Sequence, residues 1–307
     1  MNEIENILIC GLGAIGSIYA EKISEFDNTN LKILVDENRL KKYSNNPIIY
    51  NNKTLNLTYT LPDTTSYKAD LILISTKADG LMWACENIKN FIHENTIILP
   101  LLNGIESEDI LAKLYGWNRV LNAYVICHSS MRKGNKITHD GINTIFFGTK
   151  FSQYQNNIEA LKKYFDKVGI NYETPNDIIY SQWKKFALNA CANPLTAIYG
   201  FTFGEALKNK KFMTESIEII KEVQQIAKAE GVNNTENLLK DTLETLSSML
   251  PEGKTSMLQD IEAKRTTEID LFAGTIIRLG QKHNIPSLAN ETILKEIKIL
   301  EISISTI

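Results

Sequence analysis

The chain has 307 residues, of which 43% are hydrophobic and 22% are charged, as in an ordinary globular protein. At roughly 100 to 200 residues per domain, this length predicts two domains. The formal net charge of -3 gives no basic footprint, which argues against nucleic acid as a partner. No run approaches the ~18 apolar residues of a membrane helix, and no basic segment followed by an apolar one opens the sequence. We therefore expect no membrane partner and a cytoplasmic location.

The cysteines and histidines show neither a disulfide pattern nor a metal-binding pattern. Each cysteine stands in its own apolar run, so we expect reduced, buried thiols. The histidines are equally scattered, and we predict no metal site. The residues concerned are Cys10, Cys85, Cys127, Cys191, His93, His128, His139 and His283.

A glycine motif follows the first apolar run of the chain, and apolar residues then recur with helical spacing. This strand, turn and helix form the context that a dinucleotide-binding fingerprint requires. Gly11 allows a tight turn, Gly13 lets the backbone approach a pyrophosphate, and Gly16 lets helix and strand pack closely. The helix N-terminus adds positive potential. The predicted cofactor-binding turn is Gly11, Leu12, Gly13, Ala14, Ile15 and Gly16; a purely structural glycine turn is the alternative.

Residues after the second apolar run bear on the choice of nicotinamide cofactor. Asp36 follows residues 31–35, where a carboxylate can accept hydrogen bonds from the adenosine ribose and repel a 2'-phosphate, which favours NAD. Arg39, close behind it, could instead hold that phosphate and favour NADP. Arg39, Lys41 and Lys42 could also be no more than the solvated start of the next helix. The sequence leaves the preference open.

Two further polar residues follow predicted strands. Lys77 comes after the continuous apolar run 69–75, and Asn103 comes after the strand 96–100. In an open parallel sheet, the ligand crevice lies at the carboxyl ends of the strands. We therefore predict that both residues lie in the cofactor or substrate site, the alternatives being a surface lysine and a turn asparagine.

The rest of the chain predicts a change of architecture. Residues 119–148 alternate in polarity between glycine turns, which is typical of an antiparallel extension of the sheet. Beyond them we expect one more helix and a short strand, and then helices only. The predicted fold is an α/β Rossmann-type N-terminal domain over residues 1–172, followed by an all-α domain over residues 173–307.

The second half contains a regularly spaced polar stripe. Lys185, Asn189 and Asn193 recur every fourth residue in an apolar, helix-favouring run, which places them on one side of a helix. Their apolar neighbours predict that the stripe faces a partly enclosed polar cavity; a solvated stripe is the alternative. Pro194 removes a backbone donor, so we expect the helix to end or kink near Asn193.

Two later segments carry predictions of their own. Ser256 stands at the start of a predicted helix and is a candidate N-cap. The apolar segment 271–279 is either core or a dimer contact, so a homodimer stays open.

From end to end, the chain resembles the ketopantoate reductase (2-dehydropantoate 2-reductase) family. The glycine motif is shared by many dehydrogenases, and other motifs are more specific: Leu102-Asn103-Gly104, the lysine and asparagines of residues 185–197, Ser256–Asp260 and Thr267–Asp270. The resemblance implies an all-helical domain of the 6-phosphogluconate dehydrogenase C-terminal type. It also implies NADPH-dependent reduction of 2-dehydropantoate to (R)-pantoate, a step toward pantothenate and coenzyme A.

The resemblance further implies roles for individual residues. Lys185 would give a proton to the keto oxygen, with Glu268 as its catalytic partner. Asn189 and Asn193 would hold the hydroxyl and carbonyl end of the substrate, and Ser256 would meet the carboxylate. The residues that would line the nicotinamide site are Lys77, Asn103 and Glu268. Glu268 as a plain surface carboxylate, and Ser256 as no more than a helix cap, are the alternatives.

Two positions depart from the family pattern. Phe203 stands before Gly204-Glu205, where the family usually has asparagine, so one substrate hydrogen bond is missing. Asp36 agrees poorly with the family's preference for NADPH, so NADH stays open as the cofactor. The sequence therefore predicts a reductase of 2-dehydropantoate or of another small 2-oxo acid, and less strongly a dinucleotide-binding sensor without turnover.

Overall fold

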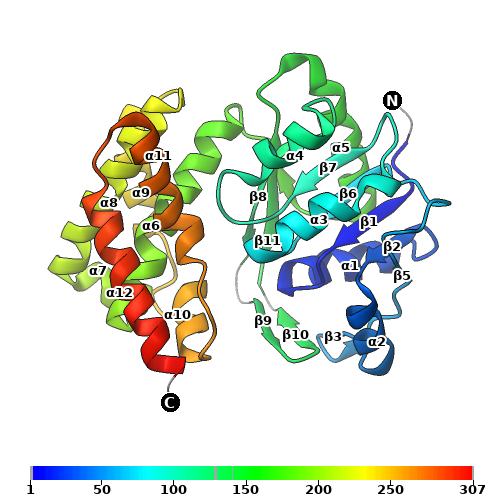
Figure 1. The fold of residues 1–307 in the computed structure, drawn as a ribbon, viewed down its shortest axis with the longest axis horizontal. Coiled ribbons are helices and arrows are strands. Elements are labelled where there is room, and N and C mark those ends of the chain that lie inside the picture. The colour runs from blue at the N-terminus through cyan, green and yellow to red at the C-terminus, as the bar shows by residue number, and fades with distance from the viewer. Residues whose placement is uncertain (1–2, 128–129, 140, 306–307) are drawn as a thin grey trace. The chain divides into compact units, whose positions relative to one another are not determined.

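The computed structural model describes residues 3–127, 130–139 and 141–305. The chain divides into two compact units, Met1–Ile178 and Ile179–Ile307 (Figure 1). The boundary expected after residue 172 falls inside the strand Tyr172–Glu173 (β12), which pairs with a strand of the first unit.

The first unit contains a five-stranded parallel sheet in the order β5-β2-β1-β6-β7. The central strands are short, fully buried apolar runs, as expected for a parallel sheet that is covered on both faces. This order matches the first part of the Rossmann arrangement and confirms the predicted fold class. The strands are Ile7–Cys10 (β1), Leu31–Leu34 (β2), Tyr59–Thr60 (β5), Leu71–Ile74 (β6) and Ile97–Pro100 (β7).

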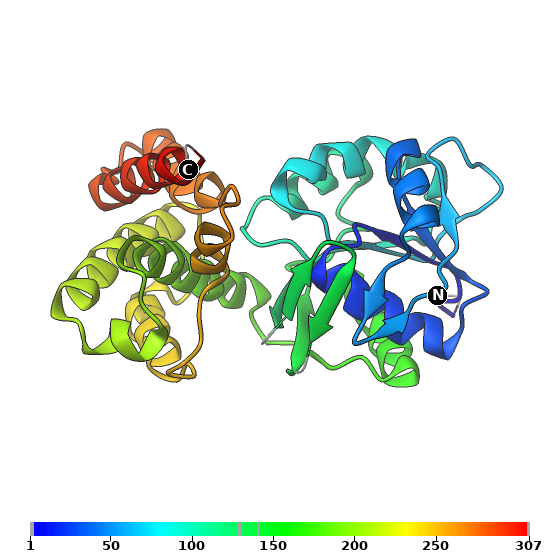
Figure 2. The ribbon, with the colours of Figure 1, turned by 90° about the horizontal axis from the view of Figure 1, so that it is seen from below.

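Helices cover both faces of this sheet because successive strand residues point to opposite sides. Ile7 and Ile9 belong to a hydrophobic core that includes residues of α1 and α5. Leu8 and Cys10 belong to a second core with residues of α3 and α4. The covering helices are Ala14–Phe26 (α1), Leu81–Asn87 (α3), Ser107–Tyr115 (α4) and Gln155–Val168 (α5), and Figure 2 shows the same elements in a second view.

The antiparallel region predicted for residues 119–148 is present, and it is divided between two further sheets. One sheet has the order β12-β11-β8, with β8 and β11 antiparallel. The other has the order β4-β3-β10-β9, in which β9 and β10 form a hairpin. The strands are Ile49–Tyr50 (β3), Lys53–Thr54 (β4), Asn122–Cys127 (β8), Ser130–Lys133 (β9), Lys136–His139 (β10) and Asn143–Gly148 (β11).

The described part of the second unit is helical throughout, as predicted. Helix α8 packs against α7, α9, α11 and α12. The apolar segment 271–279 is core rather than a free surface, because Phe272, Ala273 and Ile276 are at most 1% exposed. The helices are Ile178–Tyr199 (α6), Phe203–Lys208 (α7), Lys210–Ala229 (α8), Leu238–Ser247 (α9), Ser256–Glu262 (α10), the π-helix Asp270–Gly274 (η5), Thr275–His283 (α11) and Leu288–Ser305 (α12).

Helix α6 does not end near Asn193. It continues through Pro194 to Tyr199, so of the two expected outcomes, an end or a kink, the end is wrong. A proline inside a helix removes one hydrogen bond, but here the surrounding residues are buried and hold the helix in place. The Thr196 hydroxyl also donates to the Ala192 carbonyl at 2.8 Å. Packing has overridden the local signal.

Within the described residues, no helix is both long and apolar enough to cross a membrane.

Candidate active site

Residues predicted to bind the cofactor lie just beyond the carboxyl ends of the parallel strands, at one edge of the sheet. Cys10 pairs with Leu34 and with Ile74, and Ile74 pairs with Pro100. Four strands therefore reach their carboxyl ends side by side. The residues that follow those ends are Gly11, Asp36, Lys77 and Asn103.

The glycine turn has two positions that exclude a side chain and one that is open. Gly11 has a φ of +106°, and a Cβ there would lie 2.7 Å from the carbonyl carbon of Ser75. A Cβ on Gly16 would lie 1.9 Å from the Gly11 carbonyl oxygen. At Gly13 the nearest atom would be 3.9 Å away. Gly11 and Gly16 therefore hold strand and helix together, whereas Gly13 leaves room for a ligand.

The N-terminus of α1 suits an anion. Gly13 is the N-cap, no side chain caps the helix, and the first turn contains no acidic residue. The first amides of a helix have no partner within the helix, and the helix dipole is positive at this end. With the open side of Gly13, this fits the pyrophosphate of a dinucleotide.

Two side chains that sequence reasoning missed fix the shape of this turn. The Ser75 hydroxyl donates to the Gly11 carbonyl at 2.8 Å. Arg132, on β9, donates from Nη1 to the Leu12 carbonyl and from Nε to the Gly134 carbonyl. Ser75 directly follows the strand β6, which pairs with β1, so its place beside the turn could have been predicted from the sequence. Arg132 is 120 residues from Leu12, and no local pattern indicated that the two would meet.

Asp36 and Arg39 form a pair at the start of the helix Glu37–Asn45 (α2). Asp36 is the N-cap, and its Oδ1 accepts from the Arg39 amide at 2.7 Å. Its Oδ2 accepts from Arg39 Nη1 at 2.8 Å, and the Arg39 guanidinium lies 6.0 Å from the ring centre of Trp83. The side chains are 33% and 55% exposed. The carboxylate that could accept from the ribose and the guanidinium that could bind a 2'-phosphate are therefore paired with each other at one exposed position.

Lys77 and Asn103 differ in exposure. Lys77 is exposed and immediately precedes a single 3-10 turn, Ala78–Gly80. Asn103 is half-buried in the loop between β7 and α4. Both follow the carboxyl ends of strands, as the sequence predicted.

The predicted catalytic stripe lies on α6 in the second unit. Lys185 and Asn189 are half-buried, whereas their neighbours Phe186, Ala187 and Ala190 are at most 1% exposed. The first two members of the polar stripe are thus partly accessible on a helix that otherwise contributes to the core. Asn193, one turn further, is 5% exposed.

Asn193 and Ser256 are in direct contact. Asn193 Oδ1 accepts from the Ser256 hydroxyl and from the Met257 amide, both at 3.2 Å. Ser256 is not the N-cap of α10, so that prediction is wrong. Thr255 has the extended backbone of a cap, and its hydroxyl accepts from the Leu258 amide. Capping by Thr255 leaves the exposed Ser256 hydroxyl to meet Asn193.

Glu268 lies half-buried just before the helix that contains η5. The adjacent Thr267 anchors this corner, because its amide and hydroxyl both donate to Glu301 Oε1 at 2.7 Å. The ring centre of Phe272 in η5 lies 6.1 Å from that of Phe186, the neighbour of Lys185. This ring contact therefore joins the segment that follows Glu268 to the turn of α6 that contains Lys185. Short π-helical segments occur often at functional sites.

Phe203 packs against the loop that leads to Thr255 and Ser256. A Cβ on Gly253 would lie 3.0 Å from a ring carbon of Phe203. The Phe203 amide also donates to the Gly253 carbonyl at 3.0 Å. The half-buried ring thus stacks on backbone and offers no hydrogen bond at this position.

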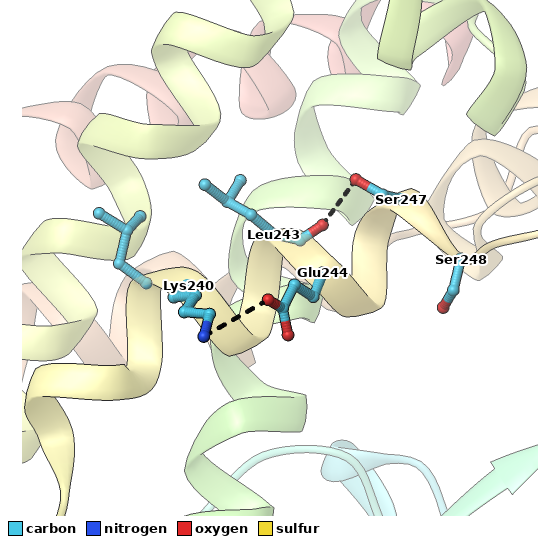
Figure 3. A pocket seen from close by; sticks show the side chains of 6 residues that line it. Lys240, Leu243, Glu244, Ser247 and Ser248 are labelled. Atoms are coloured by element: carbon cyan, nitrogen blue, oxygen red, sulfur yellow. Dashed lines mark hydrogen bonds and ion pairs between the residues drawn. The ribbon is translucent and has the colours of Figure 1, made fainter.

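The pocket drawn in Figure 3 is a shallow hollow along α9. The Ser247 hydroxyl in it donates to the Leu243 carbonyl at 2.8 Å, and Lys240 faces Glu244 at 3.8 Å. None of the predicted site residues lines it. Its groups satisfy one another on a single helix, so it adds no candidate chemistry.

No group of three or more histidine, cysteine or acidic side chains that could hold a metal ion occurs among the described residues. His128 lies outside them.

Family comparisons cover most of the chain. The model described as "Ketopantoate reductase PanE/ApbA" matches residues 7–150, and its C-terminal counterpart matches residues 177–301. A 2-dehydropantoate 2-reductase of Vibrio cholerae is 26% identical, covering 96% of this chain and 98% of the relative. An uncharacterized oxidoreductase of Bacillus subtilis, YkpB, is 25% identical with the same coverage of both chains.

Solved structures show the same fold. A 2-dehydropantoate 2-reductase from Geobacter metallireducens superposes with a TM-score of 0.81 at 25% identity, covering 95% of this chain and 99% of that chain. A D-mandelate dehydrogenase with NADH and anilino(oxo)acetate superposes with a TM-score of 0.86 at 22% identity, covering 98% and 99%. Because the two family models together match well over half of the sequence, the chain belongs to the ketopantoate reductase family of oxidoreductases.

Proposed function

We propose that this protein reduces 2-dehydropantoate to (R)-pantoate with NADPH, as part of pantothenate biosynthesis. The observation that carries the proposal is the polar stripe on α6, in which Lys185 and Asn189 are half-buried and the buried Asn193 is hydrogen-bonded to Ser256. A relative that bears the name of this activity matches over nearly its whole length. The first domain would bind the cofactor, and the second would supply the substrate-binding and catalytic residues.

Lys185 is the proposed proton donor. When bound, the reduced nicotinamide supplies a hydride to the keto carbon. Negative charge then grows on the keto oxygen, and the Lys185 ammonium within hydrogen-bond reach stabilises that charge and gives up a proton. Glu268, on the corner that packs toward the Lys185 turn, would hold the ammonium in position. The half-buried setting of Lys185 limits competition from water.

The hydrogen bonds of the second domain suggest how Asn193 and Ser256 divide their work. Asn193 Oδ1 is already committed to Ser256 and Met257, so Asn193 would offer its Nδ2 group to the substrate. Ser256 would turn its hydroxyl from Asn193 to the substrate carboxylate, and Met257 would keep Asn193 in place. Asn189, one turn earlier, would donate a second hydrogen bond to the substrate from its side-chain amide.

For the cofactor we propose NADPH, with NADH as the alternative. The exposed Arg39 guanidinium can form a charge-assisted bond with a 2'-phosphate. Asp36 would then keep its bond from the Arg39 amide and lose the one from the side chain. If NADH is used instead, the intact pair leaves Asp36 to accept from the ribose hydroxyls.

A different small 2-oxo acid is the second candidate substrate. Phe203 places a ring at the position where the family usually has asparagine, which removes one hydrogen bond and favours a more apolar substrate. The D-mandelate dehydrogenase carries an anilino(oxo)acetate, an aromatic 2-oxo acid derivative. That likeness concerns the fold alone, and it serves here to choose a second test compound. A non-catalytic sensor is less well supported, because a sensor does not need the proton donor.

The test is a matrix of initial rates. Oxidation of NADPH or NADH would be followed by absorbance with 2-dehydropantoate or 2-oxo-2-phenylacetate as the substrate. The proposal predicts the highest kcat/KM for NADPH with 2-dehydropantoate. A higher value for the aromatic acid would transfer the function to the second candidate. Cofactor binding without turnover of either acid would contradict both.

A homodimer is also proposed, and light scattering in solution would test it. One structural neighbour, from Staphylococcus aureus, is described as a dimeric ketopantoate reductase.

A further inference from the structure

A cysteine, a histidine and an asparagine meet in the first unit, and neither the cofactor edge nor the substrate stripe uses them. Cys127 Sγ lies 3.9 Å from His139 Nδ1. The other ring nitrogen, Nε2, lies 3.1 Å from Asn143 Nδ2. The imidazole therefore stands between a thiol and an amide, with one nitrogen directed to each.

Three strands bring these side chains together. Cys127 ends β8, and Asn143 begins β11 directly opposite it in the antiparallel register. Opposed residues of such a pair project to the same face. His139 ends β10 in the neighbouring sheet, where Asn51 accepts from its amide at 2.9 Å and donates to its carbonyl at 2.7 Å. The histidine is thus fixed through its backbone as well as its ring.

The side-chain oxygen of Asn143 is a buried polar atom without a hydrogen bond among the described residues. Asn143 as a whole is 5% exposed. Rotation of a side-chain amide by half a turn exchanges the places of its oxygen and its nitrogen. Rotating this amide by half a turn would let Oδ1 accept from a protonated Nε2, which leaves Nδ1 free to take the proton of the thiol. Thiol, imidazole and amide then have the order found in cysteine nucleophile sites.

Two tyrosines of the same unit interact electrostatically with Cys127. The Tyr19 hydroxyl on α1 is fully buried and has no hydrogen bond in the described residues. Burial, and after it the charge of a Cys127 thiolate, raises the pKa of Tyr19 well above its usual value. Burial, Glu21, Cys127 and Glu25, in that order, raise the pKa of Tyr50 on β3 to about 12. Both tyrosines stay neutral near pH 7, and His139 is the group whose ring nitrogen lies against the Cys127 sulfur.

The other cysteines lack such surroundings. Cys10 and Cys191 are fully buried, and Cys85 is 1% exposed. Burial raises the pKa of Cys10 and Cys191 to about 12 and that of Cys85 to about 11. A thiol reacts through its thiolate, so these three are inert near neutrality. Cys127 is half-buried and belongs to no disulfide.

We propose that Cys127 is a histidine-activated thiol and the selective site at which peroxides and soft electrophiles modify this protein, with His139 as the base and Asn143 as the residue that orients it.

The modification of Cys127 needs only this cluster and one reagent, either hydrogen peroxide or iodoacetamide. His139 takes the proton of the Cys127 thiol. With hydrogen peroxide, the thiolate attacks one oxygen, the O–O bond breaks, and a sulfenic acid and hydroxide form. The imidazolium returns the proton to the hydroxide, which leaves as water, so sulfur is oxidised and peroxide reduced. With iodoacetamide, an S–C bond forms and iodide leaves.

The first test is mapping on the wild-type protein. Native protein is treated with iodoacetamide over a range of pH, quenched, and digested for mass spectrometry of all four cysteines. We expect the first alkyl group on Cys127, with a rate that rises at a pH below the ordinary thiol pKa of about 8.5. Peroxide with a sulfenic-acid trap should label the same residue. Labelling of Cys85 as fast as Cys127 would overturn the proposal.

Matched variants separate activation from mere exposure. His139→Gln should slow alkylation of Cys127 at pH 7 by about tenfold or more and move its pH midpoint upward. His93→Gln, which changes another paired histidine of the same unit, should leave both unchanged. An unchanged rate and midpoint in folded His139→Gln would contradict the role of His139. If that variant does not fold, Asn143→Ala carries the test, with the same upward shift expected and an unchanged midpoint overturning the proposal.

Discussion

Replacement of Asn193 separates the structural role of this residue from its proposed substrate role. Asn193→Ala removes the oxygen that accepts from Ser256 and Met257. The Met257 residue is 2% exposed, so its amide would remain buried without a partner. An unsatisfied buried group costs about 1 to 3 kcal/mol. At 1.4 kcal/mol per tenfold, the first turn of α10 should open about 5 to 150 times more often.

Hydrogen exchange of the peptide covering α10 measures this opening locally. Asn189→Ala is the matched control, because it removes an amide from the same side of α6 one turn away. It should leave exchange in α10 unchanged. Asn193→Asp keeps the accepting oxygen and should also preserve slow exchange, while its charge raises the KM for an anionic substrate. Unchanged exchange in Asn193→Ala, or equal acceleration in Asn189→Ala, would refute this reasoning.

Three further predictions concern the cofactor edge and stability. Arg39→Ala should weaken NADPH binding about tenfold or more, the usual worth of a charge-assisted bond, and change NADH binding little; equal losses by titration calorimetry would contradict its phosphate role. Arg132→Ala should weaken both cofactors about fivefold or more by releasing the Leu12 carbonyl, whereas the exposed neighbour substitution Lys133→Ala should not, and fluorescence titration would show the difference. Burial raises the pKa of Glu230, but its bonds from Lys282 and His283 outweigh burial and lower it overall. This stabilisation is therefore present above the ordinary glutamate pKa of about 4.3 and is lost as pH falls through the lowered value. Glu230→Gln should lower the unfolding temperature at pH 7, and this deficit should shrink as pH falls through the lowered pKa of Glu230; a deficit that does not change with pH would refute the linkage.

Local patterns were enough to predict most of the first domain. The runs that became β1, β6 and β7 are short, apolar and buried on both faces, so they could form little else than strands of a covered parallel sheet. The glycine motif then placed the turn and the following helix. The positions of Asp36, Lys77 and Asn103 were predictable because each stands within three residues of a strand end.

Other features depend on partners far along the chain. Pro194 signals a helix end, yet packing carries α6 past it. Thr255 and Ser256 are both competent caps, and only the backbone geometry of Thr255 decides between them. Arg132 and the cluster of Cys127, His139 and Asn143 arise from strand pairings that no local spacing reveals.

Single-turnover kinetics would test the central claim most directly. Enzyme loaded with NADPH would be mixed with excess 2-dehydropantoate, and loss of the reduced nicotinamide would be followed in the wild type and in Lys185→Ala. Loss of a general acid lowers the rate by roughly 10² to 10⁴-fold. The account predicts a fall of at least about 10²-fold with NADPH affinity preserved. An unchanged hydride-transfer rate in Lys185→Ala would remove Lys185 from the mechanism and contradict the account.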